Sequence, residues 1–313
     1  MSDERLLPEL YLHGGLGNQM FQIAAMVNKY GQNNFLVNFS LQNNLHYLTG
    51  PNILDTNLKD FFQFVNIPNN SFLFKKIINS LIRLSTKSDM ITFKIRILVY
   101  IFKALLSKIY LNGREIILNN GIGFSNIDNS SKNPFIIGYY QSYVWLTDPS
   151  VKKIFLNIKF SNEGRELQNF IQRAVAESPL VVHIRLGDYR SDPNLGHVSK
   201  EYYLFNLKQE WDSQVYKKIW IFSDEANLAK ELIPPYLIPY CVWVDDEISN
   251  PATIFQIMRL GQGYILSNST FGWWAASLCN NINPKIIVPK PWFKNQEDPS
   301  KLIPEKWVQN SAL

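Results

Sequence analysis

The sequence predicts an α/β protein with two domains, each built on a parallel sheet. One observation is the alternation of short apolar runs of strand length with helical segments, which is typical of parallel sheets. A second is the length of 313 residues, which is enough for two domains that each have a core. A third is the composition, because 46% apolar and 14% aromatic residues are typical of a globular protein.

The first strand, turn and helix lie near the N-terminus. A strand at 10–13 turns through 14–18 into a helix, and a strand near 35–39 completes a βαβ unit. The buried face of the helix is predicted to include Met20, Ile23, Ala24 and Val27.

Three further strand–turn–helix patterns lie in the second half of the chain. Their strands are predicted at 180–184, 219–222 and 263–266. The turns and helices that follow the last two strands are predicted at 223–225 and 226–232, and at 267–270 and 271 to about 278.

A last strand is predicted at 286–288, ending at Pro289, because proline interrupts the hydrogen bonds of a sheet. We place the domain boundary near Lys159. An N-terminal domain then spans 1–158, including a basic and apolar insert at 72–110, and a C-terminal domain spans 159–313.

The cysteines and the N-terminal residues favour a cytoplasmic protein. Cys241 and Cys279 are too few for a disulfide framework, and no metal-ligand spacing such as Cys-x-x-Cys is present. The first residues lack the apolar core of a signal peptide. The glycosylation sequon 268–270 falls in a turn with a predicted function, where a glycan would be out of place.

The basic charge is concentrated in the insert at 72–110. It contains eight Lys and Arg residues and one acidic residue, a net charge of +7. The whole chain has a net charge of +5, so the rest of it sums to −2.

The insert also contains a predicted apolar helix. The apolar residues at helical spacing are Ile95, Leu98, Phe102, Leu105 and Ile109. Charged residues within the helix argue against a membrane span. We predict a core helix with a solvated basic edge, with a helix lying on anionic lipid as the alternative. Nucleic-acid binding is not expected, because the interleaved glycine and aromatic residues of base-stacking modules are absent.

The glycine-rich turn at 14–19 matches no common nucleotide-binding or esterase motif. Met20 stands where a dinucleotide fingerprint has its third glycine, and the Gly-Lys-Ser/Thr of a P-loop is absent. No Gly-x-Ser-x-Gly esterase elbow occurs either. Two interpretations stay open: a tight structural turn, or backbone that a ligand approaches closely at the N-terminus of a helix.

Polar residues end three of the predicted strands, and each has a structural alternative. His183 and Arg185 point to the same face of their strand, where the alternatives are a satisfied core histidine and a salt bridge from Arg185 to Asp188. The other polar residues are Ser223, Asp224, Ser269 and Thr270, which could simply cap the helices that follow. The acidic cluster 245–247 is predicted to be a solvated loop.

Taken together, these strand ends predict a pyrophosphate site without a metal. Ligands of open α/β sheets bind beyond the carboxyl ends of the strands. Arg185 with Ser269 and Thr270 would hold the phosphates, since the guanidinium and a helix N-terminus both favour anions. Asp224 could accept hydrogen bonds from a guanine edge.

The residues resemble the bacterial α-1,2-fucosyltransferases of glycosyltransferase family 11, across most of the chain outside 72–110. The segments similar to the family's motifs are 14–22 (Gly-Gly-Leu-Gly-Asn-Gln-Met-Phe-Gln), 183–189 (His-Ile-Arg-Leu-Gly-Asp-Tyr), 222–225 (Phe-Ser-Asp-Glu) and 267–276 (Ser-Asn-Ser-Thr-Phe-Gly-Trp-Trp-Ala-Ala), with weaker ones at 138–142 and 289–293. Leu186 departs from the family, which commonly has a second arginine there.

The resemblance implies a GT-B architecture, with two facing Rossmann-type domains that each have a parallel sheet. It also implies an inverting transfer of L-fucose from GDP-β-L-fucose to the 2-hydroxyl of a terminal β-galactose, without a metal or another cofactor. The expected setting is O-antigen synthesis in the cytoplasm, on the inner face of the membrane if the acceptor is lipid-linked.

The resemblance further implies roles for particular residues. Arg185 would contact the β-phosphate, while His183 and Asp224 would hold the nucleoside. Asn18 would lie near the reacting centre. The residues expected to contact GDP-fucose also include Gly15, Gly17, Ser269, Thr270 and Phe271.

The general base and the exact activity stay open. Asp188 is the nearest candidate for the base, and orienting Arg185 or the turn is its alternative role. A fucosyltransferase with another linkage or acceptor is one alternative function. A nonenzymatic protein that binds nucleotides or anionic surfaces is the other.

Overall fold

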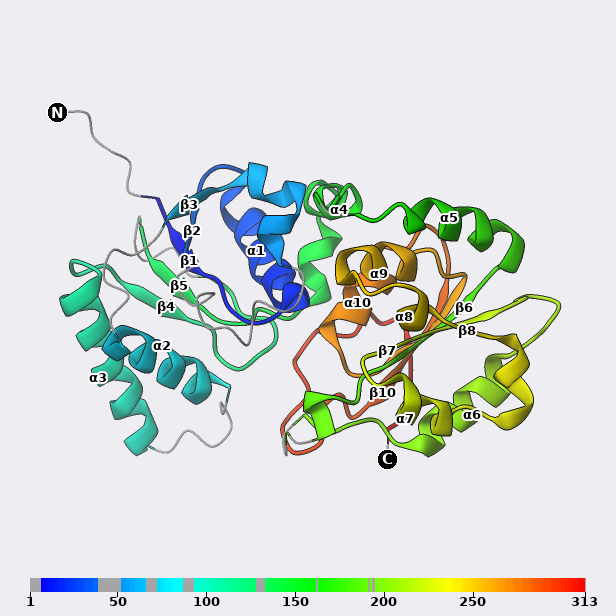
Figure 1. Ribbon diagram of the computed structural model, residues 1–313. Helices are drawn as coiled ribbons and strands as arrows, with labels where there is room; N and C mark the ends of the chain where they lie inside the picture. The colour runs from blue at the N-terminus through cyan, green and yellow to red at the C-terminus, as the bar shows by residue number, and fades with distance from the viewer. Residues whose placement is uncertain are drawn as a thin grey trace. The chain divides into compact units, whose positions relative to one another are not determined.

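The computed structural model describes residues 7–38, 52–65, 72–86, 93–127, 133–161, 163–190, 192 and 195–312. The chain divides into two compact units, each with its own sheet (Figure 1). Unit 1 comprises Met1–Ile158 with Pro299–Leu302, and unit 2 comprises Lys159–Asp298 with Ile303–Leu313. The return of 299–302 to unit 1 is absent from the sequence-based division. Every strand pair within the described residues is parallel, so the prediction of two parallel-sheet α/β domains is confirmed.

The sheet of unit 1 has the strand order β3-β2-β1-β5-β4. Its strands are β1 (Glu9–Tyr11), β2 (Leu36–Asn38), β3 (Gln63–Val65), β4 (Ile116–Leu118) and β5 (Phe135–Ile137). Its helices are α1 (Leu16–Tyr30), α2 (Phe72–Ser85), α3 (Phe93–Tyr110) and α4 (Pro149–Leu156). Short 3₁₀ helices lie at Ile53–Asp55, Asn57–Phe61 and Tyr143–Thr147.

Helix α1 begins earlier than the sequence predicts. Its first residue is Leu16, so Gly17 and Asn18 belong to its first turn and not to the loop before it. Met20, Ile23, Ala24 and Val27 are all buried, as predicted.

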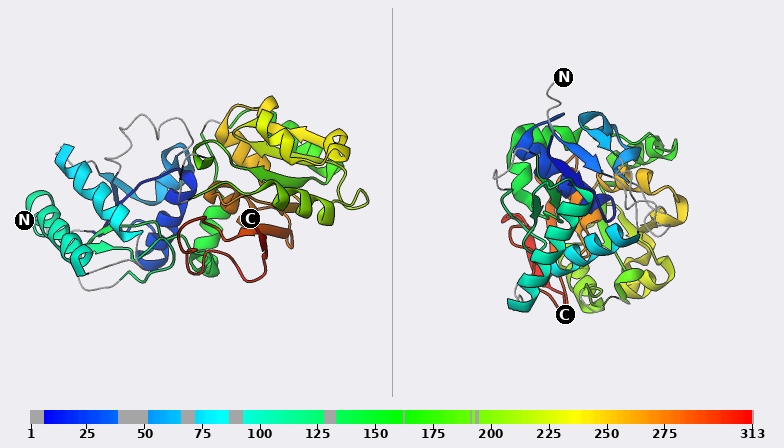
Figure 2. Two further views of the ribbon diagram at one scale, coloured as in Figure 1. Left: turned by 90° about the horizontal axis from the view of Figure 1, so that it is seen from below. Right: turned by 90° about the vertical axis from the view of Figure 1, so that its left-hand side faces the viewer.

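Helices α2 and α3 lie side by side, as Figures 1 and 2 both show. Phe74, Ile78 and Leu81 of α2 share a buried cluster with Tyr11 and Phe135 of the sheet. Helix α2 therefore covers one face of the unit 1 sheet, and α3 adds to the same cluster chiefly through Leu106.

Helix α3 packs on the core, but the side predicted to face the core is wrong. Leu98, Leu105 and Ile109, three of the five residues expected to face the core, are exposed. The fully buried position is Leu106. Apolar residues occur on both sides of α3, so their spacing predicts a helix without indicating which side packs. No helix among the described residues is long and apolar enough to cross a membrane.

The sheet of unit 2 has the strand order β11-β10-β9-β6-β7-β8. Its strands are β6 (Leu180–Ile184), β7 (Ile219–Ser223), β8 (Cys241–Trp243), β9 (Gly263–Ile265), β10 (Lys285–Lys290) and β11 (Val308–Ser311). Its helices are α5 (Glu166–Glu177), α6 (Lys200–Glu210), α7 (Ala226–Ala229), α8 (Val244–Glu247), α9 (Pro251–Met258) and α10 (Thr270–Ser277). Its 3₁₀ helices are Asp188–Arg190, Lys230–Leu232 and Pro235–Tyr240.

Helices cover both faces of the unit 2 sheet, with α5, α9 and α10 on one side and α6 and α7 on the other (Figure 1). Leu180, Val182 and Ile184 of the central strand β6 pack with residues of α6. His183 instead approaches Gly272 of α10. The alternation along β6 therefore directs His183 to the α10 side.

The predicted last strand is wrong in two respects. Strand β10 continues through Pro289 to Lys290, and β11 follows it at the edge of the sheet. Strand β9 pairs with β10 only as far as Ile287. Proline is tolerated at residue 289 because β10 has already passed the end of its pairing with β9. The helix predicted at 226–232 is also divided, into α7 and a 3₁₀ helix at Lys230–Leu232.

Candidate active site

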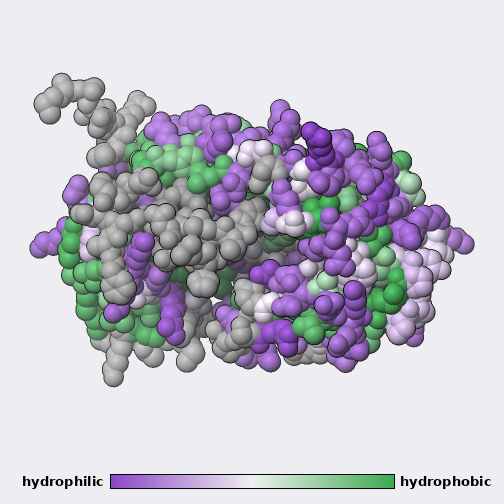
Figure 3. Space-filling view, viewed as in Figure 1, coloured by the Kyte–Doolittle hydropathy of each residue, from purple (hydrophilic) through white to green (hydrophobic). Residues whose placement is uncertain are grey.

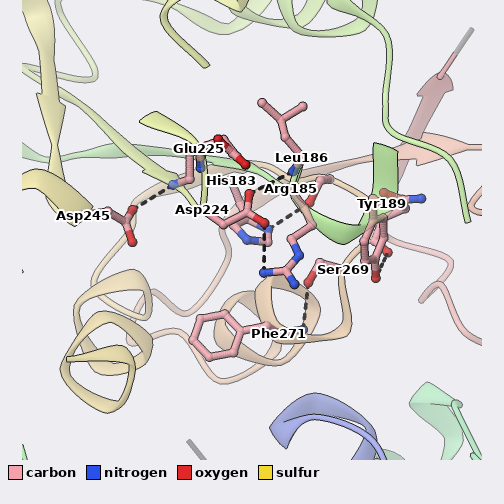
Figure 4. Close-up of polar contacts among 12 residues, drawn as sticks. His183, Arg185, Leu186, Tyr189, Asp224, Glu225, Asp245, Ser269 and Phe271 are labelled. Atoms are coloured by element: carbon pink, nitrogen blue, oxygen red, sulfur yellow. Dashed lines mark hydrogen bonds and ion pairs between the residues drawn. The ribbon is translucent and has the colours of Figure 1, made fainter. Parts of the chain in front are cut away.

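The strand order of unit 2 brings the predicted polar residues together. Strand β6 lies between β9 and β7, and all three run parallel. Their carboxyl ends therefore lie at one edge of the sheet, where open α/β sheets bind ligands. The residues at or just beyond these ends are His183 and Arg185 after β6, Asp224 after β7, and Ser269, Thr270 and Phe271 after β9 (Figure 4).

An ion pair between Arg185 and Asp224 occupies the middle of this edge. Nη1 of Arg185 lies 3.2 Å from Oδ2 of Asp224, and Oδ1 of Asp224 accepts the backbone N–H of Leu186 at 2.9 Å. The two side chains are 36% and 23% exposed, so the pair is accessible to a ligand. Figure 4 shows the guanidinium of Arg185 extending toward the first turn of α10.

Asp224 is an ion-pair partner of Arg185, and the sequence suggests Asp188 as another. Asp188 begins the short 3₁₀ helix Asp188–Arg190, so it lies four residues beyond the end of β6. Its side chain lies outside what the structure describes. Its proposed part as base or orienting group therefore stays a prediction.

Gly187 and Tyr189 lie next to the ion pair between Arg185 and Asp224. A Cβ atom on Gly187 would lie 2.5 Å from Oδ2 of Asp224, which is too close for any side chain. The ring of Tyr189 lies 5.6 Å from the guanidinium carbon of Arg185, within the range of a cation–π contact. The Tyr189 hydroxyl donates to the backbone oxygen of Asn268 at 3.4 Å.

His183 lies buried next to this pair. Its Nδ1 is 3.0 Å from the hydroxyl of Ser267, and its backbone oxygen accepts from Tyr203 at 3.4 Å. Burial, aided by the charge of Arg185, lowers the pKa of His183 to about 3. The imidazole is therefore neutral at neutral pH. A Cβ on Gly272 would come within 2.6 Å of Nδ1, so this glycine allows α10 to approach the histidine.

The N-terminus of α10 is capped by Ser269. The Ser269 hydroxyl accepts the backbone N–H of Phe271 at 3.3 Å. The capping alternative is therefore observed for Ser269, and its O–H remains a donor. A helix N-terminus favours an anion through its free amides and its dipole, so capping and phosphate binding are compatible at this position.

Capping is not the role of Ser223 and Asp224. Helix α7 has Glu225 as its N-cap, without a side-chain cap hydrogen bond. The Ser223 hydroxyl accepts the N–H of Glu225 at 3.1 Å, while Asp224 reaches back to Arg185.

Two further residues at this edge had no assigned part in the sequence. The first is Asn268, which the sequence marks only as part of a sequon and which is buried. Its Nδ2 lies within hydrogen-bonding distance of three backbone oxygens, those of Leu195 (3.2 Å), Gly196 (3.0 Å) and Trp292 (3.0 Å). It therefore ties two loops to the end of β9. A buried amide with these contacts leaves no place for a glycan.

Asp245 is the second such residue, and its expected place in a solvated loop is wrong. It lies in α8, and its Oδ2 accepts the backbone N–H of Ser223 at 2.7 Å. Burial raises the pKa of Asp245 to about 6, and the nearby charges of Asp224 and Asp246 add to the shift. The signal that could have identified it is its position just after an apolar strand. No group of three or more His, Cys, Asp and Glu suited to a metal ion occurs among the described residues.

The remaining candidates, Gly15, Gly17 and Asn18, belong to unit 1, at the carboxyl end of β1. Gly14 has a φ of +78°, and a Cβ there would lie 2.7 Å from Nδ2 of Asn18. Gly15 is the N-cap of α1 and is exposed, with nothing within 4 Å of a Cβ. Gly17 is buried in the first turn of the helix. The backbone at Gly15 is thus open to a ligand, whereas Gly14 is required by the turn.

Asn18 is held by a residue from beyond β5. Its Oδ1 accepts a hydrogen bond from Nε2 of the buried Gln141 at 2.9 Å. The amide group of Asn18 is therefore oriented, with its oxygen toward Gln141.

His13, which the sequence placed only as the end of a strand, lies next to this turn. Its backbone N–H donates to Oε1 of Gln22 at 3.1 Å, which orients the amide so that Nε2 of Gln22 donates to Nδ1 of His13 at 2.7 Å. Burial lowers the pKa of His13 to about 4, so the ring is neutral and carries its proton on Nε2. That nitrogen is buried without a hydrogen-bond partner among the described residues.

Comparison with known proteins identifies the family. The model of glycosyl transferase family 11 matches residues 9–308. An α-1,2-colitosyltransferase of Escherichia coli is 27% identical over 95% of this chain and 97% of its own length. The O-antigen biosynthesis glycosyltransferase WbnK of the same organism is 26% identical over 95% and 98%.

Among solved structures, the fucosyltransferase NodZ from Bradyrhizobium aligns with a TM-score of 0.44 and 10% identity, over 87% of this chain and 92% of its own. An ADP-heptose heptosyltransferase II of Escherichia coli aligns with a TM-score of 0.44 and 9% identity, over 97% and 90%. The match of the family model to nearly the whole chain shows that this protein belongs to glycosyltransferase family 11.

Proposed function

We propose that this glycosyltransferase moves L-fucose from GDP-β-L-fucose to the 2-hydroxyl of a terminal β-galactose, with inversion, during O-antigen synthesis. Membership of family 11 supports the reaction class. The names of the two relatives support the α-1,2 linkage and the O-antigen setting. The observation that carries the proposal is an accessible Arg185, held by Asp224, at the edge of the sheet where α10 begins.

The proposed mechanism uses this edge to stabilise the leaving group. The acceptor hydroxyl attacks the anomeric carbon opposite GDP, through a transition state with oxocarbenium character, and negative charge grows on the β-phosphate. The guanidinium of Arg185 can donate two hydrogen bonds to that phosphate. The free amides at the N-terminus of α10 add a second, fixed stabilisation. With these groups the proposed reaction needs no metal and no other cofactor.

Asp224 has two parts in this proposal. It positions Arg185 and, through its other oxygen, the turn at Leu186. Two carboxylate oxygens offer about four lone-pair sites, so Asp224 can also accept from a guanine edge. His183 supports the same nucleotide as a neutral group, since burial lowers its pKa to about 3.

Unit 1 is proposed to provide the acceptor side. The exposed backbone at Gly15 allows close approach of a ligand, and Gly17 lies buried in the first turn of α1. Asn18, oriented by Gln141, would place the acceptor hydroxyl. Asp188 would either take the proton of that hydroxyl or orient the turn.

Transfer of colitose is the second candidate, because an α-1,2-colitosyltransferase is similar to 95% of this chain. Colitose is L-fucose without the 3-hydroxyl, so a pocket for one sugar can accept the other. A site built to hydrogen-bond the 3-hydroxyl would reject the sugar that lacks it.

One incubation separates the candidates. The protein is given GDP-fucose or GDP-colitose with a panel of β-galactosides in the presence of EDTA, and the linkage of the product is determined by NMR. We expect an α-1,2-fucosylated galactoside at a rate that EDTA leaves unchanged. Transfer of colitose alone would overturn the donor assignment, and another linkage would overturn the acceptor position. No product, together with no thermal shift on adding GDP, would favour a nonenzymatic binder of anionic surfaces.

A further inference from the structure

Helix α3 presents a row of exposed apolar side chains on its side away from the core. Ile97, Ile101, Leu105 and Ile109 are spaced by four residues, so they lie on one side of the helix. They are between 41% and 56% exposed, whereas the neighbouring Leu106 is fully buried. We call these four residues the α3 stripe.

Other exposed apolar residues extend the α3 stripe. Leu98 and Tyr100 are 42% and 74% exposed, and Leu73 of the neighbouring α2 is 50% exposed. Figure 3 shows hydrophobic residues gathered at the left edge of the view, where Figure 1 draws α3. Single exposed apolar residues are ordinary, but a contiguous row marks a surface that contacts a partner or a membrane.

Exposed basic side chains also occur on α2 and α3. Arg96 and Lys108 of α3 and Lys76 and Arg83 of α2 are exposed. Lys103 is half-buried on α3, and burial lowers its pKa. The segment 72–110 has a net charge of +7, while the rest of the chain sums to −2.

This combination indicates an anionic lipid surface as the occupant. An apolar helix face with basic residues around it is the pattern of helices that lie in a bilayer interface. A second copy of the chain would bring the same +7 segment against itself, because a symmetric dimer joins identical patches. A membrane span is not supported, since no described helix is long and apolar enough.

We propose that α3 docks this protein on the surface of an anionic membrane. The α3 stripe lies at the boundary between headgroups and acyl chains, and Arg96 and Lys108 contact lipid phosphates. Docking holds the enzyme at a surface where a lipid-linked acceptor would be concentrated. The residues of the α3 stripe are not among those of the candidate active site, so docking does not depend on which sugar is transferred.

Vesicle flotation tests the proposal. The full-length protein is mixed with vesicles of phosphatidylcholine, with or without phosphatidylglycerol, at low and high salt. We expect flotation with the anionic vesicles and less recovery as salt rises, because salt screens the basic residues. A double variant, R96Q with K108Q, should lower the partition coefficient roughly 25-fold, since each basic residue near an anionic surface contributes about a factor of five. Ile101→Glu should abolish flotation.

Matched controls separate the surface from general effects of charge. Lys152→Gln with Lys153→Gln removes two exposed charges from α4 of the same unit, and Val175→Glu puts an acid at an 84% exposed valine of α5. Both variants should float like the wild type. All variants should keep the wild-type melting temperature and turnover on a soluble β-galactoside. Absence of turnover in every variant and in the wild type would be a failure of the proposed function, and flotation would still be measured.

Several outcomes would overturn the proposal. They are equal recovery of the wild type with neutral and anionic vesicles, no flotation at all, and equal loss in the control variants. A wild-type dimer that Ile101→Glu converts to a monomer, without flotation of either, would show that a second copy covers the α3 stripe.

Discussion

The carboxylate of Asp224 holds the guanidinium of Arg185 across the ends of two neighbouring strands, with 3.2 Å between Oδ2 and Nη1. Its second oxygen accepts the N–H of Leu186, so the carboxylate joins the end of β7 to both the side chain and the backbone that follow β6. An arginine held in this way needs little rearrangement when charge develops on a phosphate.

Replacing Arg185 should lower the turnover number without unfolding the protein. We expect Arg185→Ala to lose on the order of 10²- to 10³-fold, comparable to the loss of one preorganised donor. Arg185→Lys should lose a similar amount, because an ammonium group lacks the planar fork of the guanidinium. Turnover and melting temperature are measured together. A lysine variant with near-normal turnover would rule out the proposed contact.

Gly187→Ala should disturb the same ion pair from the backbone. The added methyl group would lie 2.5 Å from Oδ2 of Asp224, so the carboxylate must move away from Arg185. We expect a lower turnover number and weaker binding of GDP by calorimetry. Asp224→Asn provides the comparison, since it keeps an acceptor for Leu186 but loses the charge facing Arg185. If Gly187→Ala binds GDP as tightly as the wild type, the ion pair does not prepare the site.

Two buried histidines predict that stability falls in mild acid. Burial lowers the pKa of His13 to about 4 and that of His183 to about 3, where an ordinary histidine has a pKa of 6.5. The unfolded chain therefore takes up protons that the folded chain does not as the pH falls below 6.5. At pH 5 the free energy of unfolding should drop by about 2 kcal/mol per histidine relative to neutral pH.

Asp245 acts in the opposite direction. Its pKa is about 6 in the folded protein, above the ordinary value of 3.8, so the folded chain takes up this proton at a higher pH than the unfolded chain. Between pH 6 and pH 4 Asp245 therefore offsets part of the stability that the histidines lose. Urea unfolding at pH 7 and pH 5 measures the sum. His13→Gln should have a lower free energy of unfolding than the wild type at pH 7. Its free energy of unfolding should then fall less than that of the wild type between pH 7 and pH 5. An unchanged pH dependence in this variant would contradict the assignment to His13.

Asp188→Asn should separate the two roles left open for this residue. If Asp188 takes the proton of the acceptor, the asparagine variant loses the acidic limb of the rate-against-pH profile along with most of its turnover. If it orients the turn, the profile keeps its shape at a lower rate. We expect the second outcome, because Asp188 begins the 3₁₀ helix that directly follows this turn.

The gathering of Arg185, Asp224 and Ser269 at one edge could be predicted from the sequence, because each follows an apolar strand and parallel strands end together. The ion pair between Arg185 and Asp224 could not be predicted in this way. It depends on the pairing of β6 with β7, which places Ile184 opposite Ser223 and so brings Asp224 alongside Arg185. The roles of Asn268 and Asp245 likewise depend on loops that meet only in the folded chain.

The packing of α3 was beyond prediction for a different reason. Helical spacing indicates which residues share a side, but with apolar residues all around, only the position of α2 decides which side is buried. Strand β11 was missed because Val308–Ser311 is short and mostly polar, as exposed edge strands often are.

Gly14 and Gly15 are neighbours with opposite requirements, which yields a matched pair of variants. Gly14→Ala places a side chain at a φ of +78° and within 2.7 Å of Asn18, so it should destabilise the fold by about 1 to 2 kcal/mol. Gly15→Ala meets nothing within 4 Å at a φ of −71°, so the melting temperature should stay at the wild-type value. If the backbone at Gly15 contacts the substrates, as proposed, this variant should instead raise KM or lower the turnover number. Wild-type kinetics for Gly15→Ala would show that the turn is structural, the alternative that the sequence left open.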